Sequence, residues 1–171
     1  MTPRKEPDAP YRLFYRLVKE EYASDAFSGA GAEKWGGRWN PPGIKTVYLS
    51  SSKALATLEL VVHAGKAMLE KSRFVIFTLP IPEREIMALD SSKLPVNWET
   101  YQQQEETQAI GAAFLNLQGG FPLLLTVPSI LTGEDNAILN PGHPAATALF
   151  AQATSAPFAL DRRIKVDNSL R

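Results

Sequence analysis

The stretch that decides the fold is "WGGRWNPPGIKTVYLSSSKALATLELVVH", residues 35–63. A turn rich in glycine and tryptophan precedes a short strand, expected over "TVYLS", residues 46–50. A helix is then expected over "SSKALATLELVVHAG", residues 51–65, with a serine as its N-cap and Gly65 as its stop. Between residues 34 and 69 the chain carries five basic side chains, and its one acid is Glu59. A positive, glycine-containing segment of this kind favours an anionic ligand, because backbone N–H groups can approach closely and arginine can clamp phosphate.

Outside this stretch, the chain alternates short apolar runs with helical patterns. Residues 24–43 hold five glycines and two prolines and are expected to form a long loop. Further strands are expected at 11–18, 73–81, 84–90, 121–127 and 157–166, with a loop at 128–144. A second helix is expected over 99–117, ended by Gly119 and Gly120. The pattern predicts a single α+β domain over residues 11–171, after a loose segment at residues 1–10.

The composition excludes several classes of function. The 171 residues include 18 lysines plus arginines and 18 aspartates plus glutamates. This balance argues against binding of nucleic acid or an anionic membrane through the net charge of the whole protein. The absence of cysteine rules out disulfides, cysteine-based zinc sites and a thiol nucleophile, and two histidines argue against a His-rich metal site. No apolar run approaches a membrane span and the N-terminus has no signal-peptide core, so we expect a cytoplasmic protein.

Glu59 is the most informative side chain of the expected helix. Apolar residues recur there at i, i+3 and i+7: Leu55, Leu58 and Val62. Glu59 lies four residues after Leu55, so it shares that face, where an unpaired buried carboxylate costs several kcal/mol at order of magnitude. Two interpretations stay open. Glu59 either forms a structural ion pair with Arg38 or Arg16, or it is a catalytic carboxylate at the mouth of a site.

Arg38, Tyr48 and Glu59 lie on consecutive elements: a loop, a strand and a helix. The connections are short enough for Tyr48 and Glu59 to converge, with Arg38 reaching in from the loop. An arginine for phosphate, an aromatic side chain for a planar ring and a carboxylate for a developing cation form a set suited to cleaving a dinucleotide. The segment "GAGAEKWGG", residues 29–37, neither follows a clear strand nor opens a long helix, which disfavours a Rossmann site and hydride transfer.

Three segments together resemble the RES domain, the toxin half of RES–Xre toxin–antitoxin pairs. They are "YRL" at residues 15–17, "FSGAGAEKWGGRWNPPGIKTVYLSSSKALATLEL" at 27–60 and "VPSILTGEDNAILNPGHP" at 127–144. The resemblance runs from about Tyr15 to the final strand. It implies an ADP-ribosyltransferase-like fold, with small mixed or antiparallel sheets and flanking helices. It also implies consumption of NAD+ by hydrolysis, phosphorolysis or ADP-ribosyl transfer.

The resemblance carries the family's functional residues onto five positions. The arginine of GGRWN is Arg38, the tyrosine of the next strand is Tyr48 and the helical glutamate is Glu59. The serine of the VPS motif is Ser129, and the arginine of the early YRL is Arg16. By this resemblance Glu59, Tyr48 and Arg38 are catalytic, while Arg16, Arg38, Tyr48 and Ser129 hold NAD+. It implies no metal and no cofactor beyond NAD+ as substrate.

The resemblance also implies a partner: an Xre-type antitoxin that covers the active site within a hetero-oligomer. The chain would then contact DNA only through the antitoxin. The acceptor of ADP-ribose stays open between water, phosphate and a protein side chain, and a non-catalytic nucleotide-binding module is the alternative function. The roles of Asn136, Asn140 and His143 also stay open, with bonds to loop backbone preferred for the asparagines and a structural role for His143.

Overall fold

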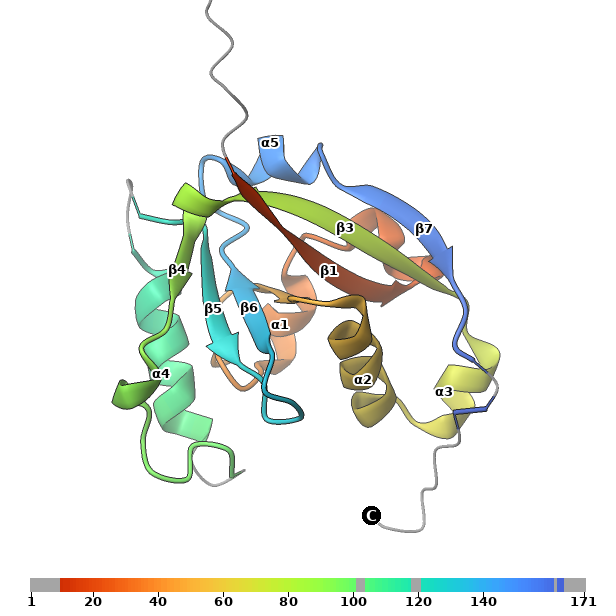
Figure 1. The fold of residues 1–171 in the computed structure, drawn as a ribbon, viewed down its shortest axis with the longest axis horizontal. Helices are drawn as coiled ribbons and strands as arrows, with labels where there is room; N and C mark the ends of the chain where they lie inside the picture. The colour runs from red at the N-terminus through yellow and green to blue at the C-terminus, as the bar shows by residue number, and fades with distance from the viewer. Residues whose placement is uncertain (1–9, 101–103, 118–120, 162, 165–171) are drawn as a thin grey trace, which may run out of the picture.

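The computed structural model describes residues 10–100, 104–117, 121–161 and 163–164, and its centre is one seven-stranded sheet (Figure 1). The strand order is β4-β5-β6-β2-β1-β3-β7, and every neighbouring pair is antiparallel except β4 and β5. The expected α+β class, with small mixed or antiparallel sheets and flanking helices, is confirmed, and the strands form one mostly antiparallel sheet. The strands are β1 (Tyr11–Lys19), β2 (Val47–Ser50), β3 (Phe74–Pro82), β4 (Ile86–Ala88), β5 (Leu124–Pro128), β6 (Asp135–Leu139) and β7 (Thr154–Phe158). The α-helices are α1 (Ala30–Trp35), α2 (Lys53–His63), α3 (Lys66–Lys71), α4 (Gln104–Leu115) and α5 (Ala146–Phe150), and the 3-10 turns are η1 (Glu20–Asp25), η2 (Glu83–Glu85) and η3 (Ser91–Lys93).

The sheet consists of two wings that meet at a narrow seam. Strand β1 pairs with β3 along its whole length, from Tyr11 opposite Pro82 to Lys19 opposite Phe74. By contrast, β1 and β2 share a single register pair, Tyr15 opposite Ser50. The β4-β5-β6-β2 wing and the β1-β3-β7 wing therefore diverge on either side of this pair, and α2 lies below the seam in Figure 1. Contacts of α2 with both β1 and β2 hold this helix at the junction.

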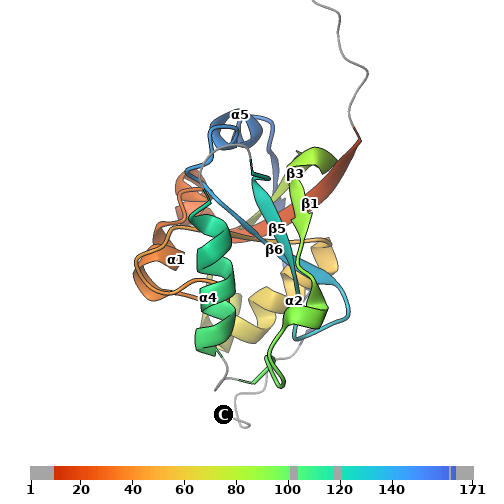
Figure 2. The same ribbon diagram turned by 90° about the vertical axis from the view of Figure 1, so that its left-hand side faces the viewer.

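Strict alternation along β2 divides its side chains between two apolar clusters. Val47 and Leu49 point into the larger cluster, which joins both wings to α5 and includes Phe14. Tyr48 and Ser50 point to the opposite face. On that face, α4 lies beside β5 and β6 (Figure 2). Phe114 and other apolar side chains form the contact between them. The four residues "VYLS" thus connect the core to the face on which the candidate site lies.

The helix after β2 forms as expected, although its exposed face differs from the prediction. The Ser52 hydroxyl accepts a hydrogen bond from the Leu55 backbone N–H, which is the predicted N-cap. The helix ends at His63, and Gly65 opens the short α3 instead of acting as the stop. Leu55 is buried, but Leu58 and Val62 are exposed, so the predicted apolar face is only partly buried.

Three further expectations need correction. The expected loop at 24–43 contains α1, and the expected loop at 128–144 contains β6, whose residues pair with both β2 and β5. The strand expected at 157–166 is β7, which starts at Thr154 and ends at Phe158. Gly119, Gly120 and nearly all of the N-terminal segment 1–10 lie outside the described residues. No helix in the described part of the chain is long and apolar enough to cross a membrane.

Candidate active site

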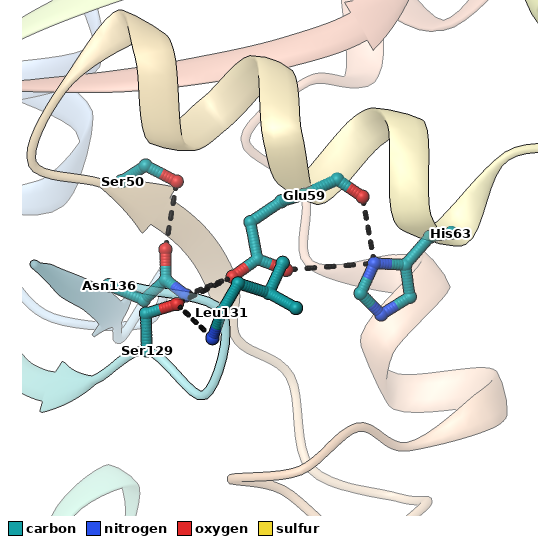
Figure 3. A network of polar contacts seen from close by, with 6 residues as sticks. All are labelled: Ser50, Glu59, His63, Ser129, Leu131 and Asn136. Atoms are coloured by element: carbon teal, nitrogen blue, oxygen red, sulfur yellow. Dashed lines mark hydrogen bonds and ion pairs between the residues drawn. The ribbon is translucent and has the colours of Figure 1, made fainter. Parts of the chain in front are cut away.

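Glu59 projects from α2 toward the ends of β2, β5 and β6, where these strands approach the seam (Figure 3). Its side chain is 24% exposed, so the carboxylate is largely covered but still reaches solvent. One carboxylate oxygen, Oε1, accepts hydrogen bonds from the amide of Asn136 at 2.5 Å and from the hydroxyl of Ser129 at 3.3 Å. These partners are neutral, so they hold the carboxylate in place without cancelling its charge.

A second layer of hydrogen bonds fixes the two donors. The hydroxyl of Ser50 donates to Asn136 Oδ1 at 2.9 Å, which orients the amide so that its NH2 group faces Glu59. The Leu131 N–H donates to Ser129 Oγ at 3.1 Å and steers that hydroxyl toward the same carboxylate (Figure 3). Ser50 and Ser129 are both buried. The carboxylate is thereby pre-oriented before any ligand enters, as a catalytic group requires.

His63 lies one helical turn after Glu59 and is the remaining polar neighbour drawn in Figure 3. Its Nδ1 lies 2.8 Å from the Glu59 carbonyl oxygen and 3.6 Å from the carboxylate oxygen Oε2. A carbonyl oxygen can only accept, so this contact places the imidazole proton on Nδ1. The His63 side chain is 76% exposed and marks the solvent edge of the site.

The structure contradicts the ion-pair interpretation of Glu59. The Arg38 guanidinium donates through Nη1 to the carbonyl oxygens of Trp98 at 2.9 Å and Thr100 at 3.4 Å. The Arg16 guanidinium donates through Nη1 to the Tyr48 carbonyl oxygen at 2.8 Å. Both arginines therefore bond main-chain oxygens, and in the described residues neither bridges to Glu59.

Arg16 is a half-buried cation that lacks an anionic partner among the described residues. Desolvation of the guanidinium lowers the pKa of Arg16 to about 10, so the side chain stays charged at neutral pH. Its Nε atom is buried and has no hydrogen-bond partner in the described part of the chain. A half-buried, incompletely satisfied guanidinium next to the seam is a ready binding site for an anion.

Tyr48 lies on the same face of β2 as Ser50, but its hydroxyl is already bonded to the glycine-rich loop. It donates to Asn40 Oδ1 at 2.7 Å and accepts from the Trp39 N–H at 3.0 Å. Burial raises the pKa of Tyr48 to about 12, which the two loop contacts and the nearby Arg38 charge oppose in part. Tyr48 thus holds the loop that carries Arg38, and its hydroxyl is not directed at Glu59.

The predicted residues accordingly form two adjacent groups. Glu59 and Ser129 meet directly, whereas Tyr48 is linked to Arg16 through its carbonyl and to Arg38 through the loop. Strand β2 connects the groups, because Tyr48 and Ser50 are two residues apart, or roughly 7 Å along a strand. The expected direct convergence of Tyr48 and Glu59 is replaced by this arrangement along one strand.

Sequence reasoning undervalued Asn136. We expected it to bond loop backbone, but it lies on β6 and bonds Glu59 and Ser50. Only the register of β6 against β2, which places Asn136 opposite Ser50, identifies this role. Asn140 does bond backbone, at Leu115 O and Gly142 N, as expected.

His143 is held by backbone groups away from this network. Its Nδ1 accepts from the Ala145 N–H at 3.1 Å, and its Nε2 donates to the Phe121 carbonyl oxygen at 2.9 Å. It lines a shallow pocket with Arg84 and Glu85, on a different part of the molecule from the Glu59 network. In the described residues, no group of three or more His, Asp or Glu side chains is arranged to hold a metal ion.

Comparison with known proteins gives consistent matches over nearly the whole chain. The profile of the RES domain family matches residues 13–161. The chain is 36% identical over 154 residues to Toxin Res of Yersinia enterocolitica, covering 90% of this chain and 99% of that protein. It is 34% identical over 145 residues to the Prs ADP-ribosylating toxin of a Sphingobium species, covering 81% and 88%.

A solved structure shares the fold. The crystal structure of the M. tuberculosis MbcT–MbcA toxin–antitoxin complex contains a chain that superposes with a TM-score of 0.61. The match covers 88% of this chain and 86% of that chain. The identity is 22%, so this likeness concerns the fold alone.

Proposed function

Because the chain belongs to the RES domain family, we propose that it is the toxin of a toxin–antitoxin pair and that it consumes NAD+ by cleaving the bond between nicotinamide and ribose. The observation that carries the proposal is the Glu59 carboxylate, held by the neutral donors Asn136 and Ser129 at the edge of solvent. Similarity to proteins named Toxin Res and Prs ADP-ribosylating toxin supports the assignment.

The proposed reaction breaks the glycosidic bond and leaves its electron pair with nicotinamide. The ribose then develops oxocarbenium character, as in glycoside cleavage generally. Nicotinamide leaves as a neutral ring, so the step needs no strong general acid. Glu59 stabilises the positive ribose electrostatically, and the neutral donors Asn136 and Ser129 preserve its full negative charge for that purpose.

The two arginines bind the anionic part of the substrate. Arg16, half-buried and without a carboxylate partner among the described residues, binds a pyrophosphate oxygen. Arg38 donates to two carbonyl oxygens through Nη1 and presents its remaining N–H groups to the same ligand. Tyr48 contributes by holding the Arg38 loop, and its ring packs beside the nicotinamide end. Ser129 both orients Glu59 and lines the ribose site.

The acceptor of ADP-ribose is water, phosphate or a protein side chain, and mass spectrometry of products with and without phosphate or cell lysate distinguishes them. The proposed partner is an Xre-type antitoxin that covers Arg38 and Glu59 within a hetero-oligomer in the cytoplasm. The chain contacts DNA through this partner. Operator binding by the isolated chain as tight as that of the complex would contradict this part of the proposal.

The test is NAD+ loss with purified wild-type chain and with Glu59→Gln. The substitution keeps the shape of the side chain and an oxygen for Asn136 and Ser129, so we expect a folded protein. Because Glu59 acts on a charge that develops as the bond breaks, kcat should fall far more than the affinity for NAD+. An exposed control, Glu21→Gln, should keep wild-type turnover.

Two outcomes would redirect the assignment. Equal turnover by wild type and Glu59→Gln would remove Glu59 from the reaction. NAD+ recovered intact from the wild type after long incubation, despite measurable binding, would identify the chain as a nucleotide-binding module instead.

A further inference from the structure

One face of α4 is directed at the main chain of the loop that carries Arg38. The side chains of Gln104 and Gln108 both donate to the Gly37 carbonyl oxygen, at 3.1 and 2.8 Å. The Thr107 hydroxyl lies 2.7 Å from the Arg38 carbonyl oxygen, its nearer acceptor, and 3.0 Å from the Gln104 carbonyl oxygen of its own helix. This threonine is fully buried. Positions 104, 107 and 108 share a helix face. Three side chains of one helix therefore fix two successive peptide groups of the loop.

Gly111 continues the same face one turn later and allows the helix to touch the loop. A Cβ atom built on Gly111 would overlap the Trp39 carbonyl oxygen, which is main chain and cannot rotate away. Glycine in a helix interior costs roughly 1 kcal/mol relative to alanine. The helix accepts this cost at a position where a side chain would overlap the loop backbone.

The segment just before α4 fixes the Arg38 side chain itself. Carbonyl oxygens of Trp98 and Thr100 accept from Nη1 of the guanidinium. In the described part of the chain, Nε and Nη2 form no hydrogen bond. These two nitrogens form one edge of the planar guanidinium and can bind two oxygens of a phosphate side by side. The carbonyl contacts thus set the direction in which this edge points.

Packing of α4 on the sheet does not require these polar contacts. The helix buries Phe114 and Leu115 against Leu125, Val127 and Ile138, and this contact is apolar. The polar face at 104–108 instead acts on the loop, while Tyr48 holds the loop from the sheet side. The loop is clamped between a helix and a strand, a geometry suited to pre-organising a ligand-binding side chain.

We propose that residues 98–100 and 104–111, here called the Arg38 clamp, act as a positioning element that aims Arg38 at the pyrophosphate of NAD+. Thr107, Gln108 and Gly111 are positioning residues that act through Arg38 and do not themselves touch the substrate. The inference rests on the proposed function, because it takes NAD+ as the ligand of Arg38.

The test is a double-mutant cycle on NAD+ affinity, in a Glu59→Gln background that preserves the ligand. Thr107→Val keeps the shape of the side chain but removes the donor to the Arg38 carbonyl. It should raise the Kd for NAD+ about three- to tenfold, the effect of losing one hydrogen bond. In an Arg38→Ala chain the same substitution should change Kd less than twofold, because the carbonyl contact remains but the guanidinium that it positions is gone. Thr107→Ser, which keeps the hydroxyl, should restore affinity.

A merely structural role for Thr107 predicts a different pattern. Equal losses of affinity with and without Arg38, or an unchanged Kd in a folded Thr107→Val chain, would overturn the inference. If the wild-type chain binds NAD+ and Thr107→Val binds it with the same Kd, the inference fails but the proposed function stands. A wild-type chain that fails to bind NAD+ at all would overturn both.

A matched glycine pair provides an independent check. Gly111→Ala should raise Kd for NAD+, whereas Gly31→Ala, which lies in α1 with open space around it, should not. Equal affinities for these two folded variants would contradict the clamp. If Gly111→Ala does not fold, the Thr107→Val and Thr107→Ser pair still decides the question.

Discussion

Replacing Arg16 with methionine should raise the Tm of the ligand-free protein. The same change should reduce the increase in Tm that NAD+ produces. Burial lowers the pKa of Arg16 from 12.5 to about 10, without a carboxylate partner in the described residues. At 1.36 kcal/mol for each pKa unit, this shift corresponds to an upper limit of about 3 kcal/mol for holding the charge in the folded protein. Methionine fills much of the same space without a charge to desolvate.

The net effect follows from two opposing contributions. Arg16→Met removes the burial cost of about 3 kcal/mol but also the hydrogen bond to the Tyr48 carbonyl, worth about 1 kcal/mol. The difference, at most about 2 kcal/mol, predicts a higher Tm, by up to roughly 4–8 °C for a chain of this size. Affinity for NAD+ should fall roughly ten- to hundredfold, because a charge-assisted contact to pyrophosphate is worth about 1.5–3 kcal/mol.

Thermal unfolding with and without saturating NAD+ measures both effects on the same samples, all of which carry Glu59→Gln so that the ligand is preserved. The control is Arg12→Met, an exposed arginine four residues earlier on β1, which should leave the Tm and the NAD+ shift nearly unchanged. NAD+ should raise the Tm of the wild type and of Arg12→Met more than that of Arg16→Met. A ligand-free Arg16→Met chain that melts below the wild type and binds NAD+ normally would show that Arg16 is structural, and the reasoning would be refuted.

Two other substitutions test the polar network and the tyrosine. Asn136→Leu removes the donor to Glu59 and the acceptor of Ser50, so kcat for NAD+ loss should fall at least tenfold in a folded protein; unchanged kinetics would separate Asn136 from the reaction. Tyr48→Phe should lower the unfolding free energy by about 1–3 kcal/mol at neutral pH, because two hydrogen bonds to the loop are lost. The pKa of Tyr48 is about 12 in the folded protein and 10.0 in the unfolded chain. The contribution of the neutral phenol to the unfolding free energy is therefore complete below pH 10 and is lost as the pH rises toward 12. Denaturation across this range should therefore show a decline in the wild type that Tyr48→Phe lacks.

Elements with a self-contained local signal could be predicted from the sequence. Strand β3 is a long β-branched and aromatic run, and α2 has its serine cap. Strand β6 gives no such signal, because "GEDNAILNPG" begins and ends with turn residues. It is a strand because Asp135–Leu139 pairs with β2 on one side and β5 on the other, and this context overrides local preference.

The site shows the same division between local and long-range information. Glu59 could be selected from sequence because a lone acid in a basic segment is conspicuous, and the motif resemblance selected Ser129. The place of Asn136 could not be found, because it depends on a pairing across 86 residues with Ser50. The direction of the Tyr48 hydroxyl was equally inaccessible, because it depends on how the loop folds back over β2.

The arrangement of charge at the seam argues for a ligand that carries charges of both signs. A protein built only for stability would pair a buried guanidinium with a nearby carboxylate, because burying a lone charge is costly. Here Arg16 bonds the Tyr48 carbonyl, and Glu59 is held by the amide of Asn136 on β6 and by the hydroxyl of Ser129 just after β5. Each charge is fixed in position and left uncompensated by the other. NAD+ has an anionic pyrophosphate and a cationic nicotinamide riboside. One molecule can therefore pair its pyrophosphate with Arg16 and its riboside with Glu59. The separation of Arg16 from Glu59, which local stability does not favour, is what such a substrate requires.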